Sequence, residues 1–182
     1  MAGSTNSAMA STSNNIFLRS VAVISTLAGW IASAMILAAV FVTCEMIFVR
    51  FVLNHSTVWQ TEFVIYLIVC ATLLGLPYVQ HMRGHVNVDL IPLMLGVKLR
   101  YYLCVLTYSI SAIIVAIMTY YGFDYWHIAW SKGWTSDTIW AVRLWIPYMA
   151  LPVGFGLFLL QLIADLVAVI LKIDTPFGLE TK

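Results

Sequence analysis

Long apolar runs, separated by short polar segments, dominate the hydropathy pattern of the chain. The clearest run covers residues 63–79, where no residue is charged. A helix of roughly 17 residues is about 26 Å long, close to the thickness of a bilayer's hydrocarbon. Similar apolar runs follow Arg19, Arg100 and Arg143. The pattern therefore predicts four membrane-spanning helices, at about residues 21–51, 62–80, 101–122 and 143–172.

The segments between and beyond these runs predict the rest of the domain plan. Residues 1–18 are mostly small and polar, and they predict a disordered tail ahead of a four-helix domain at 19–172. Residues 86–97 are apolar but too short to cross a bilayer, and residues 123–140 carry tryptophans at helical spacing. Both segments predict short helices in the membrane interface. Residues 173–182 predict a charged C-terminal tail.

Composition agrees with this pattern and narrows the class of protein. The chain is 62% hydrophobic and 9% charged, with a mean hydropathy of +0.94, values far from those of a soluble domain. Nine Lys and Arg against eight Asp and Glu create no basic field, so we expect no nucleic-acid partner. The three cysteines lack metal-ligand spacing and are expected to be small apolar residues. The expected fold class is an all-α integral membrane protein.

The distribution of positive charge predicts the orientation. With four spans, six of the nine Lys and Arg fall on the side of both termini and of the loop between the second and third spans, and three fall on the other side. Because positive loops stay in the cytoplasm, both termini are expected inside.

The sequence lacks the catalytic and cofactor-binding motifs that would indicate an enzyme. The sequence has no phosphate-binding lysine loop, no HExxH and no glycine-rich dinucleotide turn. No charged residue lies at the centre of a predicted span, whereas helices that carry ions place polar groups there. The chain is therefore predicted to be an accessory subunit, without a cofactor or metal of its own.

A haem- or quinone-binding membrane anchor of a respiratory enzyme is the alternative. Such anchors hold haem between histidines on facing helices. His81 and His85 lie at one end of the second span, and His55 and His127 are predicted on the opposite side of the membrane. This distribution disfavours a facing pair.

Three ordered motifs carry a resemblance to a known family. Arg50-Phe51 with Asn54 ends the first span, Trp59-Gln-Thr-Glu62 opens the second, and Arg83-Gly84-His85-Val-Asn-Val-Asp89 follows it. With four spans over about 20–172, this set resembles the DctQ-like small permease subunit of tripartite ATP-independent periplasmic (TRAP) transporters. Arg83 adjoins Gly84 directly, and Thr61-Glu62 replaces a frequent double acid.

The resemblance implies a role and a set of partners. Such subunits support a large, sodium-coupled membrane subunit that moves in an elevator-type cycle. A periplasmic binding protein transiently delivers the organic acid. The resemblance therefore implies a scaffold in the bacterial inner membrane, with sodium coupling and substrate choice residing in other polypeptides. It marks the motif residues as scaffold positions: Arg50, Asn54, Trp59, Glu62, Arg83, Gly84, His85 and Asp89.

Several residues could contact a partner or lipid. Ser25, Gly29 and Ser33 recur every four residues on the first span and form a small-residue face suited to helix pairing. The aromatic residues Trp126, Trp130, Trp134 and Trp140, together with Asp137, form either an interfacial belt or a docking surface. The carboxylates of Glu62 and Asp165 also have explanations that involve only neighbouring parts of the chain.

Glu62 is expected in the first turn of the second helix, where the helix dipole would stabilise it. Asp165 lies one turn after Gln161. It is either an end charge that reaches toward the headgroups or a hydrogen-bond partner of another helix.

Overall fold

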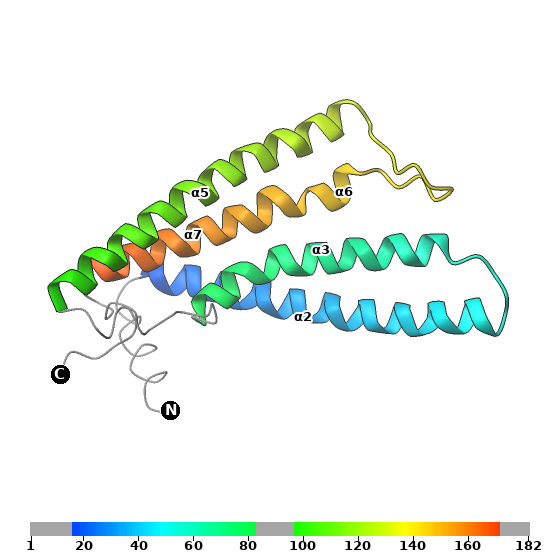
Figure 1. Cartoon of the computed structure of the whole chain (residues 1–182), viewed down its shortest axis with the longest axis horizontal. Helices are drawn as coiled ribbons and strands as arrows, with labels where there is room; N and C mark the ends of the chain where they lie inside the picture. The colour runs from blue at the N-terminus through cyan, green and yellow to red at the C-terminus, as the bar shows by residue number, and fades with distance from the viewer. Residues whose placement is uncertain (1–15, 83–96, 172–182) are drawn as a thin grey trace.

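The computed structural model describes residues 16–82 and 97–171, which form four long helices and one short one (Figure 1). The elements in order are α2 (Ile16–Phe51), α3 (Val58–His81), α5 (Val97–Ser131), α6 (Trp145–Tyr148) and α7 (Ala150–Ile170). The described residues include no strand beyond a single β-bridge between Thr135 and Arg143.

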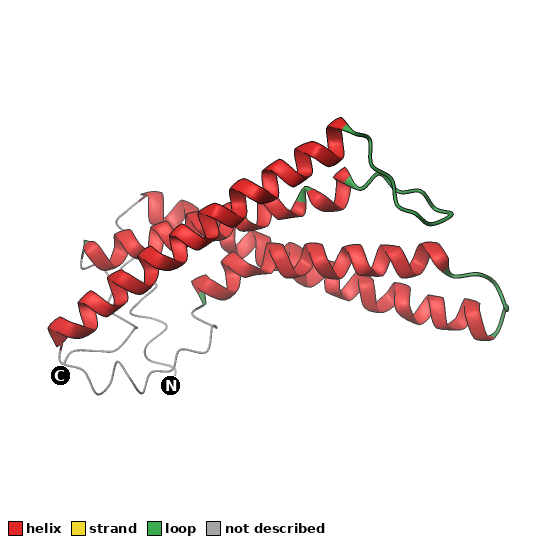
Figure 2. Ribbon diagram, turned by 45° about the horizontal axis from the view of Figure 1, so that its top comes forward, coloured by secondary structure: helices red, strands yellow, loops and turns green. Residues whose placement is uncertain are grey.

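The helices form two antiparallel hairpins, α2 with α3 and α5 with α6–α7 (Figures 1 and 2). The α2–α3 connection and the α5–α6 connection lie at one end of the bundle, which we call the turn end. The starts of α2 and α5 and the ends of α3 and α7 lie at the other end, which we call the tail end. α7 packs against α2, α3 and α5, so it joins the two hairpins.

Within the described residues, four helices are long and apolar enough to cross a membrane, as the hydropathy pattern predicts. Their most apolar windows are only 11% buried within the chain in three spans and 28% buried in the fourth. Large side chains such as Trp30, Phe41 and Ile113 are more than half exposed. This surface needs lipid or another membrane protein as its solvent, so the chain is a multi-pass membrane protein.

Helix ends differ from the sequence-based expectation in three places. α2 begins at Ile16, within the predicted tail, because Leu18 packs with Val21 and Ala164 of α7. α3 begins at Val58, about one turn early. α5 does not end at Gly122 but continues to Ser131, so no separate interfacial helix covers the described residues 123–140.

The fourth span is interrupted at Met149, between α6 and α7. Pro152 explains its position, since a proline cannot donate a hydrogen bond to the carbonyl four residues earlier and its ring crowds that carbonyl. The predicted interfacial segment 86–97 lies outside the described residues except for Val97, the first residue of α5. The tail 173–182 also lies outside them.

Two glycines allow the helices of this chain to approach closely. A Cβ on Gly154 of α7 would lie 2.8 Å from the Leu73 Cβ and 2.9 Å from the Leu73 carbonyl oxygen of α3. A Cβ on Gly29 of α2 would overlap the ring of Tyr78 of α3. In lipid such close packing is a main source of helix association.

Candidate functional site: the polar groups at the two ends of the bundle

A chain of four polar side chains links three helices in the tail-end half of the bundle. Ser25 Oγ of α2 donates to Gln161 Oε1 of α7 at 2.7 Å. Gln161 Nε2 donates to Asp165 Oδ1, and Gln80 Nε2 of α3 donates to Asp165 Oδ2, both at 2.8 Å. We call this set the polar clamp.

The polar clamp resolves the alternatives for Asp165. Its carboxylate accepts hydrogen bonds from its own helix and from α3, so it is an interhelical partner. Ser25 and Gln161 are almost fully buried, at 1% and 3% exposure. Because a buried polar group without a partner is costly in lipid, this connectivity favours one arrangement of α2, α3 and α7.

The small-residue face expected to meet a partner lies largely inside the subunit, which corrects that assignment. Ser25 belongs to the polar clamp, and Gly29 is covered by Tyr78. Ser33 is exposed, and its hydroxyl bonds to the Gly29 carbonyl of its own helix. The physical reason is that α3 and α7 supply the close neighbours that small residues permit.

At the turn end, residues 132–144 fold into an ordered hairpin-like segment, which we call the turn-end arm. Backbone hydrogen bonds join Ser136 to Val142 at 2.8 Å and Leu144 to Trp134 at 2.9 Å. Ala141 has a φ of 49°, in the left-handed region, and closes the tip with a bond to Thr138. Residues 132–140, expected to continue an interfacial helix, therefore have a different structure.

The turn-end arm reaches across to the start of α3. Trp140 lies edge-on against Trp59 and Phe63, with ring centroids 6.2 and 6.3 Å apart. Ser136 Oγ donates a hydrogen bond to Glu62 Oε1. The arm thereby ties the α5–α7 hairpin to the α2–α3 hairpin at the end opposite the polar clamp.

Glu62 has a different local role from the one expected. Since α3 begins at Val58, Glu62 lies beyond its first turn, which contains no acidic residue. One carboxylate oxygen binds Ser136, while the buried Oε2 has no hydrogen-bond partner among the described residues. The Oε1 of neighbouring Gln60 is likewise buried without one. Glu62 therefore binds the turn-end arm through Ser136.

The other motif residues fall into two groups. Arg50 is exposed in the last turn of α2, and Asn54 adopts a φ of 51° in the α2–α3 turn, a conformation that asparagine tolerates well. Trp59 is 46% exposed beside Trp140. The positions from Arg83 to Asp89, including Gly84 and His85, lie outside the described residues.

The turn-end aromatic residues form a connected group. Trp126 and Trp130 lie in the last turns of α5 with ring centroids 5.7 Å apart, and Trp130 contacts Trp145 of α6. Trp134 lies beyond the helix and contacts Tyr125. Asp137 is exposed on the arm. The structure brings Trp130 and Trp145 together with Arg143. The sequence does not predict this group, because the three residues approach one another only when the turn-end arm is folded.

The described histidines do not form a haem site between facing helices. His81 ends α3 at the tail end, whereas His55 and His127 lie toward the turn end, where His127 stacks on Phe123. Nor do the described residues contain a group of three or more His, Cys, Asp or Glu that could hold a metal ion.

The described residues define a class, the multi-pass membrane proteins, with four apolar helices joined by hydrogen-bonded polar side chains. A family model narrows this class. Residues 39–172 match the DctQ component of tripartite ATP-independent periplasmic transporters, and the chain belongs to this family. It is thus a TRAP transporter small subunit, as the motif resemblance predicts. None of the curated proteins compared with the chain matches it.

Proposed function

We propose that this chain is the fixed scaffold subunit of a secondary transporter that imports an organic acid. A large membrane subunit carries the sodium and substrate sites and moves in an elevator-type cycle, and a periplasmic binding protein delivers the acid. The small subunit has no enzymatic activity and no cofactor of its own. It gives the large subunit a stationary surface to move against.

The polar clamp is the observation that carries this proposal. Ser25, Gln80, Gln161 and Asp165 join three helices by hydrogen bonds of 2.7–2.8 Å. The turn-end arm adds a second link between the two hairpins. A subunit tied at both ends suits a stationary role, and its exposed apolar faces suit burial against a larger membrane protein.

The proposed location is the bacterial inner membrane, with both termini in the cytoplasm. In the sequence, six of the nine Lys and Arg are assigned to the side of both termini and of the loop between the second and third spans, and three to the other side. The turn end then faces the periplasm, where the arm and Asp137 are near the docking position of the binding protein. We assign a scaffold role to the motif from Arg83 to Asp89, which follows the second span in the sequence.

Transport by the isolated chain tests the scaffold role. The purified subunit is reconstituted in liposomes with an inward sodium gradient, alone and together with its large subunit and binding protein. The expected result is accumulation of a labelled organic acid only in the complete system. The control is the large subunit with binding protein but without this chain, which should show little uptake.

Uptake by this chain alone would contradict the scaffold role. Full uptake by the large subunit without it would contradict the need for a scaffold. Exchange of the binding protein and large subunit for those of another system should change the substrate, since the proposal assigns substrate choice to them.

A further inference from the structure

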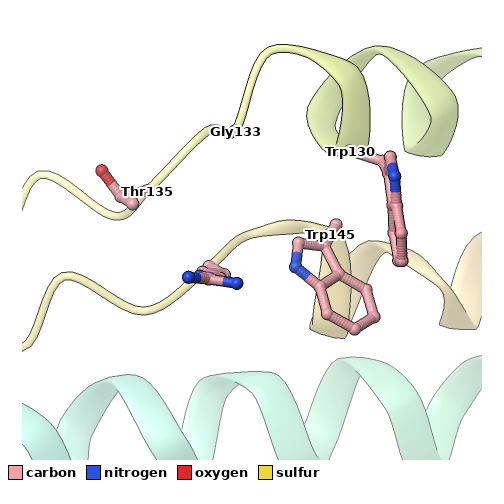
Figure 3. A pocket seen from close by; sticks show the side chains of 5 residues that line it. Trp130, Gly133, Thr135 and Trp145 are labelled. Atoms are coloured by element: carbon pink, nitrogen blue, oxygen red, sulfur yellow. The ribbon is translucent and has the colours of Figure 1, made fainter.

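A cavity of about 490 Å³ lies at the turn end, between the end of α5, the turn-end arm and the start of α6 (Figure 3). Trp130 and Trp145 stand side by side on it, with ring centroids 4.6 Å apart and planes inclined by 63°. Gly133 and Thr135 line it from the first half of the arm, and Arg143 lines it from the second half. The cavity therefore combines an aromatic wall with one cation.

The backbone positions Arg143 at the cavity. Thr135 and Arg143 form an antiparallel bridge, and the next residue, Leu144, donates its N–H to the Trp134 carbonyl at 2.9 Å. None of the lining residues is acidic, and within the described part of the chain Arg143 has no ion pair. A guanidinium presents a planar fork of donors that matches a phosphate or carboxylate group.

The space beside Gly133, which lines the cavity, is open. Gly133 has a φ of 60°, and a Cβ built there would meet no atom within 4 Å. In Figure 3 the indole nitrogen of Trp145 points away from Trp130, toward the arm. An indole N–H is a donor only, so this ring can add a hydrogen bond to an oxyanion beside Arg143.

The surroundings favour a lipid over a soluble anion. The cavity lies at the end of two candidate spans, where tryptophans meet lipid headgroups. Ile146, Met149 and Val153 continue from Trp145 along α6 and α7, and each is 42–52% exposed. An amphiphile can place its headgroup at Arg143 and its acyl chains on this apolar surface, whereas a small hydrophilic acid gains nothing from it.

We propose that the cavity binds the phosphate of an anionic phospholipid, such as phosphatidylglycerol, from the leaflet at the turn end. Arg143 holds the phosphate oxygens in a bidentate pair, and Trp130 and Trp145 cover the glycerol backbone. A volume of about 490 Å³ lies within the range of small-ligand sites.

Native mass spectrometry of the full chain tests this site. The protein is released from micelles containing equal phosphatidylglycerol and phosphatidylcholine, and the retained lipid is counted as collision energy rises. The wild type should retain one phosphatidylglycerol in preference to phosphatidylcholine. Arg143→Gln should lower that preference about tenfold, the effect of losing one charge-assisted pair. Arg143→Lys should retain charge but bind less well, because it lacks the fork.

Arg50→Gln is the matched control, since Arg50 is also exposed at the turn end but does not line the cavity. It should retain lipid like the wild type. The proposal is overturned if Arg143→Gln keeps the wild-type preference, or if Arg50→Gln lowers it equally. It is also overturned if millimolar inorganic phosphate or succinate displaces the lipid, which would identify a soluble anion as the occupant. If Arg143→Gln loses helicity by circular dichroism, the test rests on Arg143→Lys. Wild-type lipid retention by Arg143→Lys would then overturn the proposal.

Discussion

Substitution of Gly154 by alanine tests the close contact between α3 and α7. The added Cβ would lie 2.8 Å from the Leu73 Cβ and 2.9 Å from its carbonyl oxygen, while ordinary contacts begin at 3.4 Å. Part of the obstruction is backbone, so the two helices must separate by roughly half an ångström, and a close-packed interface resists such a shift. Overpacking of this kind typically costs about 1–3 kcal/mol.

Gly156→Ala is a matched control on the same helix. A Cβ there would meet only a Thr119 methyl group at 4.0 Å. This variant should gain most of the helix propensity difference between glycine and alanine, about 1 kcal/mol. Gly154→Ala receives the same gain but also incurs the overpacking cost. The two variants should therefore differ by about 1–3 kcal/mol in unfolding free energy.

The assay is reversible unfolding of the purified chain in mixed micelles, followed by circular dichroism as the denaturing detergent fraction rises. Gly154→Ala should unfold at a lower denaturant fraction than Gly156→Ala. Equal midpoints for the two variants, or a higher midpoint for Gly154→Ala, would refute the α3–α7 packing described here.

Two further predictions concern the clamp and the orientation. Gln80→Leu removes one hydrogen bond to Asp165 and should lower the unfolding free energy by about 1–2 kcal/mol in the same assay. Ser109→Ala is the control, because the Ser109 hydroxyl bonds only within α5. It should change the unfolding free energy by less than about 0.5 kcal/mol. Equal effects of Gln80→Leu and Ser109→Ala would contradict the role of the polar clamp. In a variant without native cysteines, Asp137→Cys should react with an impermeant maleimide added to intact cells, and Lys182→Cys should react only after lysis. The reverse pattern would contradict termini in the cytoplasm.

The four spans could be predicted because each depends on local composition alone, namely an apolar run of bilayer length. The end of α5 could not be predicted from local composition. Gly122 resembles a helix end in the sequence, yet a lone glycine costs a helix only about 1 kcal/mol. In the fold Gly122 is buried, and a Cβ there would lie 3.3 Å from Leu151 of α7. Its role is packing, which depends on a residue far away in the chain.

In the polar clamp and at the turn end, contacts within one helix could likewise be predicted, but contacts between distant segments could not. Gln161 and Asp165 are one helical turn apart, so their contact was predictable, whereas the bond from Gln80 depends on how α3 meets α7. The spacing of Trp126 and Trp130 correctly indicates a helix, but Trp134 follows Gly133, whose positive φ turns the chain out of it. The cavity at Arg143 depends on backbone pairing with Thr135, for which the sequence contains no clear signal.

The central position of α7 affects the order in which the chain can assemble during synthesis. α2 and α3 are neighbours in sequence and in space, so they can pair as soon as both have entered the bilayer. α5 packs mainly against α7, which is made later. Until then α5 must remain stable in lipid by itself. Its hydroxyl residues permit this, since Thr107, Ser109 and Thr119 each bond to a carbonyl four residues earlier in the same helix. α7 thus completes the packing of the four described spans, and a chain truncated before α7 would leave α5 without its main partner.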